Sequence, residues 1–194
     1  MKKIITSDQF LKINKSNKFK NIVLAHGVFD LLHIGHLRYL KRAKAMGDCL
    51  IVSITNDVNV DKGINRPFFN ENLRLEALSQ LECVNFVILS TEKTSEKIIK
   101  RIKPKIYVKG NDYKKPGKSQ LKNYKIERTA LKKIGGKFKI IDDINFSSSN
   151  LINLNFDKLD FNQRELINQI IKKDKINVNQ IEKLKIKKPI LIIG

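Results

Sequence analysis

The chain has 194 residues, of which 41% are hydrophobic and 30% charged, and its formal net charge is +20. This size suits one well-buried domain with an appendage. No apolar run approaches the roughly 20 residues that span a bilayer, and the amino terminus lacks the apolar centre of a secretion signal, so we expect a cytoplasmic protein with no membrane partner.

The positive charge raises the question of a nucleic-acid partner, because lysine and arginine neutralise phosphates. The excess is almost entirely lysine, spread along the whole chain together with many isoleucines and asparagines, a mixture that an AT-rich genome imposes on any protein. The sequence has no basic helix with interleaved aromatic residues and no zinc-finger spacing. We therefore predict no dedicated nucleic-acid partner, and small phosphorylated ligands suit the charge equally well.

From residue 21 to about 153, short β-branched runs alternate with amphipathic segments. Strands are predicted at 21–29, 49–57, 84–89, 105–110 and 137–141, and helices at 35–47, 71–82, 95–102 and 119–134. Strands separated by helices of this length predict an α/β fold with a doubly wound parallel sheet, similar to a Rossmann fold and covered on both faces. Because ligands of such sheets bind beyond the carboxyl ends of the strands, the loops there are the candidates for a site.

Two of the predicted helices carry an apolar stripe that indicates their buried face. In the helix at 35–47 the stripe consists of Leu37, Leu40 and either Ala43 or Lys44, and Gly47 is the predicted stop. In the helix at 71–82 it consists of Leu73, Ala77, Leu78 and Leu81, with Asn70 as the predicted cap.

The chain changes character after the predicted domain, which covers residues 1–154. Residues 155–188 are polar and rich in lysine and asparagine, with one amphipathic segment near 161–172, and are predicted to be a linker or a surface arm. Residues 189–194, PILIIG, have the pattern of an apolar strand. Because a buried parallel strand needs both faces covered, we expect this chain to be the front portion of a longer one.

Two histidines three positions apart, His33 and His36, flank Gly35 just after the first predicted strand. His36 falls in the first turn of the next helix, where unpaired amides and the helix dipole make the surroundings electropositive, and Gly35 lets a ligand approach the backbone. Two imidazoles that donate hydrogen bonds here make a cradle for a polyphosphate. They would act most where charge builds up on a bridging oxygen during substitution at phosphorus.

Other roles for these histidines stay open. A zinc pair needs further ligands, and only His26 or Asp30 lies nearby in the chain. General acid or base catalysis by His33 or His36 is a second alternative, although phosphoryl transfer depends more on charge stabilisation than on proton removal. His26 alone is predicted to be structural or to face the backbone.

The residues around the histidines resemble a known family. The stretch GVFDLLHIGHLRYL, at 27–40, is similar to the HxGH motif of the cytidylyltransferase-like nucleotidyltransferases and carries the family's Gly27, Phe29, Asp30 and Leu40. Further on, KGINRP resembles its KGxxRP loop, ENLRLEAL its arginine-containing helix, VKGNDY a strand end of its sugar-phosphate members, and FSSSNLIN the motif that opens its last helix. Order and spacing agree across about residues 1–153.

This resemblance implies a reaction in which a sugar or polyol phosphate attacks the α-phosphorus of a nucleoside triphosphate and releases pyrophosphate. It implies Mg²⁺ as a cofactor, held mainly by substrate phosphates and water, because the sequence shows no carboxylate cluster and no protein metal ligands are predicted. It also implies a homodimer. The catalytic residues would be His33, His36 and Lys62.

The matching positions also imply binding residues for the nucleotide and its phosphates. Asp30 would order the loop or contact metal indirectly, and Arg74 would pair either with a phosphate or with a carboxylate. A base and its ribose would lie against the backbone near Lys109, and one serine of the FSSSNLIN motif would cap the following helix or join a phosphate nest. The full set of predicted binding residues is Gly27, Phe29, Asp30, Gly35, Arg74, Lys109, Gly110, Asp112, Ser147, Ser148 and Ser149.

Within the family, VKGNDY and the long amino-terminal lead look most like the adenylyltransferase half of bifunctional heptose-phosphate enzymes of lipopolysaccharide synthesis. Glycerol-3-phosphate cytidylyltransferases are the alternative, and a non-catalytic nucleotide- or RNA-binding module is a third. His26 and Asn111 depart from the heptose pattern, which leaves base and sugar open. The end of the chain, KKPILIIG, resembles the first strand of ribokinase-like sugar kinases, so a fusion to a sugar kinase domain is expected.

Overall fold

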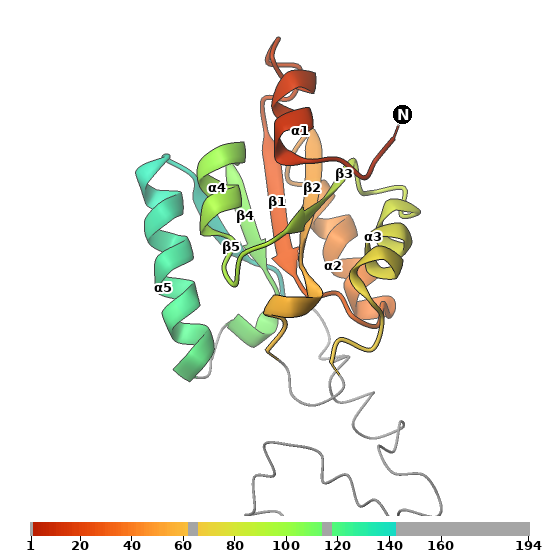
Figure 1. Ribbon diagram of the computed structural model, residues 1–194. Coiled ribbons are helices and arrows are strands. Elements are labelled where there is room, and N and C mark those ends of the chain that lie inside the picture. Colours follow the sequence, from red (N-terminus) through yellow and green to blue (C-terminus); the bar gives the residue numbers. More distant parts are fainter. Residues whose placement is uncertain (1, 62–65, 114–117, 143–194) are drawn as a thin grey trace, which may run out of the picture. The chain divides into compact units, whose positions relative to one another are not determined.

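The computed structural model describes residues 2–61, 66–113 and 118–142 (Figure 1). The predicted boundary at 154, the linker or arm at 155–188 and the strand at 189–194 lie outside these ranges and stay predictions. So do the predicted site residues Lys62, Ser147, Ser148 and Ser149. No helix in the described part of the chain is long and apolar enough to cross a membrane.

Strands and helices alternate along the chain. The strands are β1 (Ile22–Gly27), β2 (Cys49–Thr55), β3 (Phe86–Ser90), β4 (Ile106–Lys109) and β5 (Lys137–Ile140). The helices are α1 (Ser7–Ile13), α2 (Ile34–Lys44), α3 (Glu71–Ser79), α4 (Glu96–Ile102) and α5 (Lys118–Lys133), and two single turns of 3₁₀ helix are η1 (Asp57–Asn59) and η2 (Asn111–Tyr113).

The described strands form one parallel sheet in the order β3-β2-β1-β4-β5, which confirms the predicted doubly wound α/β fold. The chain builds the sheet outward from β1 to β3 and then returns to the other side of β1 with β4. The order therefore reverses between β1 and β4, and such a switch point is where open parallel sheets bind ligands.

Helices cover both faces of the sheet, and each face has its own apolar core. Alternate residues of β1 point to opposite faces: Ala25 packs with residues of α2 and α3, whereas Leu24 packs with residues of α1, α4 and α5. Figure 1 shows the sheet between these two layers, with α5 beside α4. The period of two along each strand produces this division.

The buried helix faces differ from the predicted stripes. Leu37 of α2 and Leu73 of α3 are exposed, and Ala77 is exposed as well, so these three predictions were wrong. The residues buried instead are Tyr39, Leu40 and Ala43 in α2, and Arg74, Leu75 and Leu78 in α3. The buried face of α3 is shifted by one residue because it includes Arg74. A search for apolar residues does not count a charged side chain as buried, so it misplaces this face.

Capping residues mark the starts of two helices, and the first strand ends earlier than predicted. Asn70 caps α3 as predicted, accepting a hydrogen bond from the Leu73 amide. The first strand ends at Gly27, earlier than predicted, and Phe29 then takes the left-handed conformation with φ 50°. Helix α1 was not predicted, although Thr6 and Gln9 form a capping box that marks its start.

Gly47 occupies a tight turn between α2 and β2. A Cβ atom there would overlap the carbonyl oxygen of Asn21 and lie 2.7 Å from Cγ2 of Val23. The same turn is closed by Asp48, whose amide donates to the Asn21 carbonyl and whose carboxylate accepts from the amides of Lys20 and Asn21. The turn therefore has no room for a side chain at position 47.

We expect Gly47→Ala to lower the free energy of unfolding by about 1–3 kcal/mol, because the added methyl group must displace backbone. Gly135→Ala is the matched control: its Cβ would have nothing within 4 Å, and only the positive φ of 72° opposes it, at a cost of about 1 kcal/mol. Urea unfolding of both variants measures the difference. An equal or smaller loss for Gly47→Ala would contradict the steric explanation.

Candidate phosphate-binding and catalytic site

The two histidines meet at the carboxyl end of β1. His33 is the N-cap of α2, and its Nδ1 accepts a hydrogen bond of 3.1 Å from the Gly35 amide. His36 stands in the first turn of the helix, and the two rings stack with centroids 4.0 Å apart and an angle of 28° between their planes. Both residues are half-buried. The placement expected for this pair is thus the one observed.

The hydrogen bond from Gly35 sets the tautomer of His33. Partial burial lowers the pKa of His33, which favours the neutral ring. Because Nδ1 accepts from the backbone, the neutral ring carries its proton on Nε2. His33 therefore presents a donor on the side of the ring away from the helix end.

Phe29 supports the second histidine. Its ring is buried, with centroids 5.4 Å from the His36 ring and 6.4 Å from the Tyr39 ring. Tyr39 in turn donates a hydrogen bond to the Val108 carbonyl of β4. A Cβ on Gly27 would lie 3.2 Å from the Phe29 ring, so a side chain at position 27 would crowd this ring. Phe29 is thus a packing neighbour of His36, and Gly27 is a packing neighbour of Phe29.

Asp30 fastens the histidine loop to the segment before α3. The side chain is 1% exposed, and its Oδ2 lies 2.7 Å from Nε of Arg66, while Oδ1 accepts from the Phe69 amide at 3.0 Å. Of the two roles left open for Asp30, these contacts support ordering of the loop. Arg66 was not predicted as a site residue, although it is the arginine of the KGINRP motif.

Arg74 is enclosed by oxygens of the protein. Its Nη2 donates to the carboxylate of Asp57 at 2.6 Å and to the Thr55 carbonyl, its Nη1 to the Val28 carbonyl and its Nε to the Phe69 carbonyl. The carboxylate pairing that the sequence left open is therefore the one observed. A phosphate role for Arg74 stays a prediction with no contact in its support.

Lys109 ends β4 with its ammonium group in the interior. Nζ lies 3.4 Å from Oε2 of Glu127 and donates to the His26 carbonyl and the Tyr113 hydroxyl. The side chain thus anchors η2 rather than extending into the loop. Gly110 follows, and its carbonyl accepts from the Tyr113 amide. The predicted residue Asp112 lies in η2, and its side chain is outside the described part.

Glu127 of α5 completes this buried polar cluster. Burial is the largest influence on the pKa of Glu127 and raises it, but the charge of Lys109, the nearby His26 and the hydrogen bonds with Ser95 together outweigh burial. The net shift of the pKa is downward, so Glu127 is a carboxylate. Burial is likewise the largest influence on the pKa of Lys109 and lowers it, but Glu127 and Tyr113 together more than reverse it, so the net shift is upward. The second Glu127 oxygen accepts from the Ser95 amide, and the Ser95 hydroxyl lies 2.7 Å from that of Tyr107. The pair is ionised and holds α4, α5 and β4 together.

His26 is a buried neutral histidine, as the structural interpretation expected. Its Nδ1 lies 2.6 Å from the Ser53 hydroxyl of β2. Burial, and then the charge of Lys109, lower the pKa of His26 to about 3. The zinc alternative finds no support, because the described ranges hold no group of three or more histidines, cysteines or acidic residues placed to share a metal ion.

A model of the cytidylyltransferase-like family matches residues 24–190. Bifunctional protein HldE of Campylobacter fetus is 38% identical over 159 residues, which are 78% of this chain and 31% of the relative. Bifunctional protein HldE of Helicobacter pylori is 43% identical over 113 residues, which are 57% of this chain and 24% of the relative. This chain thus spans less than a third of the length of either curated relative.

Solved structures share the fold. The lipopolysaccharide core biosynthesis protein of Thermoplasma volcanium aligns with a TM-score of 0.51 at 34% identity, covering 66% of this chain and 98% of that chain. The pantoate-beta-alanine ligase of Francisella tularensis aligns with a TM-score of 0.54 at 17% identity, covering 90% of this chain and 79% of that chain. The second likeness is one of fold alone.

The buried His26 should make stability depend on pH. Between about pH 6.5 and about 3 the unfolded chain binds a proton at this residue that the folded chain does not, so the free energy of unfolding falls as pH falls, by up to about 1.4 kcal/mol per pH unit. We expect urea unfolding between about pH 6.5 and about 5 to show a steeper slope for the parent chain than for His26→Asn. The carboxyl groups and His33 contribute equally to the pH dependence of both chains. Equal slopes would therefore contradict the claim that His26 is buried in its neutral form.

Removing one partner of the Lys109–Glu127 pair should be costly, because the other charge is left buried. We expect Glu127→Gln to lower the free energy of unfolding by about 3–5 kcal/mol and the double variant Lys109→Met/Glu127→Leu to lose less than the sum of its single changes. Glu96→Gln, which breaks the exposed Lys100–Glu96 pair, should cost below about 1 kcal/mol. Denaturant unfolding of these variants tests the cluster, and similar losses for Glu127→Gln and Glu96→Gln would contradict it.

Proposed function

Because the chain belongs to the cytidylyltransferase-like family of nucleotidyltransferases, we propose that it transfers a nucleoside monophosphate from ATP or CTP to a heptose-like sugar phosphate. The products are a nucleotide-activated sugar and pyrophosphate, and the activated sugar serves cell-surface glycan synthesis. The observation that carries this proposal is the stacked pair of His33 and His36 at the start of α2.

The geometry suits stabilisation of the leaving group. An oxygen of the sugar phosphate attacks the α-phosphorus, a new P–O bond forms, and the bond from the α-phosphorus to the bridging oxygen breaks, so negative charge develops on pyrophosphate. The Nε2 proton of His33, the His36 ring and the first amides of α2 would face that charge. A phosphate monoester is largely ionised near neutral pH, so the attacking oxygen needs no general base.

Mg²⁺ fits a site of this kind when it arrives with the substrate. Asp30, the carboxylate closest in sequence to the histidines, is already paired with Arg66, and the described residues offer no cluster of metal ligands. The ion would be held by substrate phosphates and water, and it supplies positive charge that offsets the triphosphate. The loop around Asp30 then serves to position the histidines.

The switch point between β1 and β4 is our proposed site for the base and ribose. The backbone of Gly110 and η2 follows β4 there. Lys109 holds η2 in place through the hydrogen bond from its Nζ to the Tyr113 hydroxyl. No described contact distinguishes adenine from cytosine, so both triphosphates belong in the assay. Glycerol 3-phosphate, the acceptor of the alternative function, belongs there as well.

The names and lengths of the relatives support two further parts of the proposal. The HldE relatives are named bifunctional and are more than three times as long as the region that this chain matches, which supports fusion to a sugar kinase domain. The Thermoplasma volcanium relative is named for lipopolysaccharide core biosynthesis, which supports a glycan precursor as product. A cytoplasmic location and a homodimer remain predictions, and gel filtration with light scattering tests the latter.

We expect pyrophosphate release from ATP or CTP with at least one member of a panel of heptose and other sugar 1-phosphates and glycerol 3-phosphate. Mass spectrometry of the products identifies the base and the acceptor. His33→Asn and His36→Asn should each lower kcat by about 100- to 1000-fold. Asparagine is a good helix cap, so His33→Asn keeps an acceptor for the Gly35 amide while removing the distant donor.

Lys97→Gln is the matched control, since Lys97 is exposed and pairs only with Glu92 on the surface. Its kcat should equal that of the parent chain. Turnover with no acceptor in the panel would reject the proposed transfer. Full turnover by both histidine variants would reject the role of the pair.

A further inference from the structure

Arg66 holds a buried nitrogen that the protein does not satisfy. Its side chain is 3% exposed, and Nε donates to Asp30. Nη2 is buried and has no hydrogen-bond partner among the described residues. A buried donor without a partner costs free energy and is rare in native proteins, so a polar group beyond the described residues is expected to meet this nitrogen.

The contacts of Asp30 explain why Nη2 is left over. Arginine and carboxylate commonly pair through two parallel hydrogen bonds. Here the second carboxylate oxygen of Asp30 is taken by the Phe69 amide at 3.0 Å, and Arg66 uses Nε for the first. Arg74 is the internal comparison, because each of its guanidinium nitrogens donates to an oxygen of the protein. The fold can satisfy every nitrogen of a buried arginine, and among the described residues it does not do so for Nη2 of Arg66.

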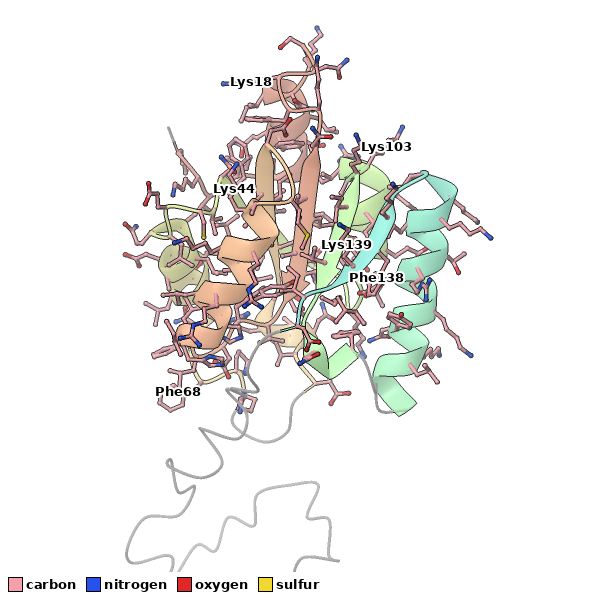
Figure 2. The ribbon with its side chains drawn as sticks, turned by 180° about the vertical axis from the view of Figure 1, so that it is seen from behind. Lys18, Lys44, Phe68, Lys103, Phe138 and Lys139 are labelled. Carbon is pink, nitrogen blue, oxygen red and sulfur yellow. The ribbon has the colours of Figure 1, made fainter. Side chains whose placement is uncertain are left out.

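The position of Arg66 indicates what the missing partner is. Asp30 precedes His33 by three residues in the same loop, so Arg66 is fixed against the segment that carries the histidine pair. The neighbouring Phe68 lies at the end of the molecule toward which the strands point (Figure 2). Ligands of a parallel sheet bind at that end, and a planar guanidinium group matches the oxygens of a phosphoryl group.

We propose that Arg66 binds a phosphoryl group of a substrate through Nη2, and that Asp30 is the positioning residue that orients it. The identity of the ligand rests on the proposed function, and the contact itself does not. Arg66 enters from the β2 and α3 side of the histidine loop, whereas the switch point lies on its β4 side. The phosphoryl group belongs either to the sugar phosphate or to the triphosphate.

Isothermal titration calorimetry of the full chain tests this proposal without turnover. The probes are ATP, CTP, inorganic pyrophosphate, inorganic phosphate and the sugar phosphate panel. Arg66→Gln should weaken the binding of at least one probe by about 10- to 100-fold, the loss expected for a charge-assisted hydrogen bond. Weaker nucleotide and pyrophosphate binding assigns the contact to the triphosphate, and weaker sugar phosphate or inorganic phosphate binding assigns it to the acceptor.

Two further variants separate ligand binding from a purely structural role. Arg66→Lys keeps a charge for Asp30 but lacks the second nitrogen of the fork, so it should bind the same probe about 10-fold more weakly. In Asp30→Asn/Arg66→Gln the pair is neutral. If Arg66 served only to neutralise Asp30, this double variant would recover parent affinity, and that result would overturn the proposal. Parent affinity of Arg66→Lys for every probe would overturn it as well.

Arg101→Gln is the control, because Arg101 is half-exposed on α4 and pairs with Asp8. It should bind every probe with parent affinity. Thermal unfolding of each variant reports on folding, and Arg66→Lys keeps the test decisive if Arg66→Gln does not fold. Absence of turnover with any acceptor would reject the proposed function and leave these binding measurements valid.

Discussion

The candidate site depends on how the buried guanidinium group of Arg74 joins the ends of the first two strands. Its donors reach the carbonyls of Val28 and Thr55 and the carboxylate of Asp57. These groups follow β1, end β2 and begin η1, so one side chain on α3 fixes the chain at three points. The Arg74 side chain is fully buried, whereas that of Asp57 is 36% exposed, so removing Asp57 leaves the guanidinium charge away from water. The loop with the histidines begins from this fixed point.

The carboxyl end of the sheet is polar on both faces, but for different purposes. On the face of α2 and α3, His33 and His36 lie at the start of α2 and Arg66 in the segment before α3, at the end of the sheet where parallel sheets bind ligands. On the face of α4 and α5, Lys109 and Glu127 neutralise each other in the interior. The second cluster places ionic contacts inside the apolar core, and the hydrogen bond from Lys109 to the Tyr113 hydroxyl connects the cluster to η2.

Hydrophobic patterning located the strands and helices from residue 21 onward, because β1, β2 and β3 are runs of mostly apolar, buried residues. It failed where charged side chains are buried. Arg74 occupies the inward face of α3, so the stripe with Leu73 and Ala77 was misplaced. A motif placed Lys109 in the nucleotide site, but only the position of Glu127, distant in sequence, shows that its ammonium group turns inward. Arg66 lies within the KGINRP motif, but no local sequence pattern reveals an unsatisfied nitrogen.

The cap of α2 restricts what can occupy position 33. His33 accepts a hydrogen bond from the Gly35 amide at Nδ1, on one side of its ring, and carries a proton at Nε2, on the other side. Hydroxyl and amide side chains place both functions at a single tip, and ammonium or guanidinium groups accept nothing. Imidazole alone among the standard side chains separates acceptor and donor across a rigid plane. Helix initiation and substrate handling therefore draw on the same five-membered ring: another capping residue can replace the acceptor, but none supplies the distant donor as well.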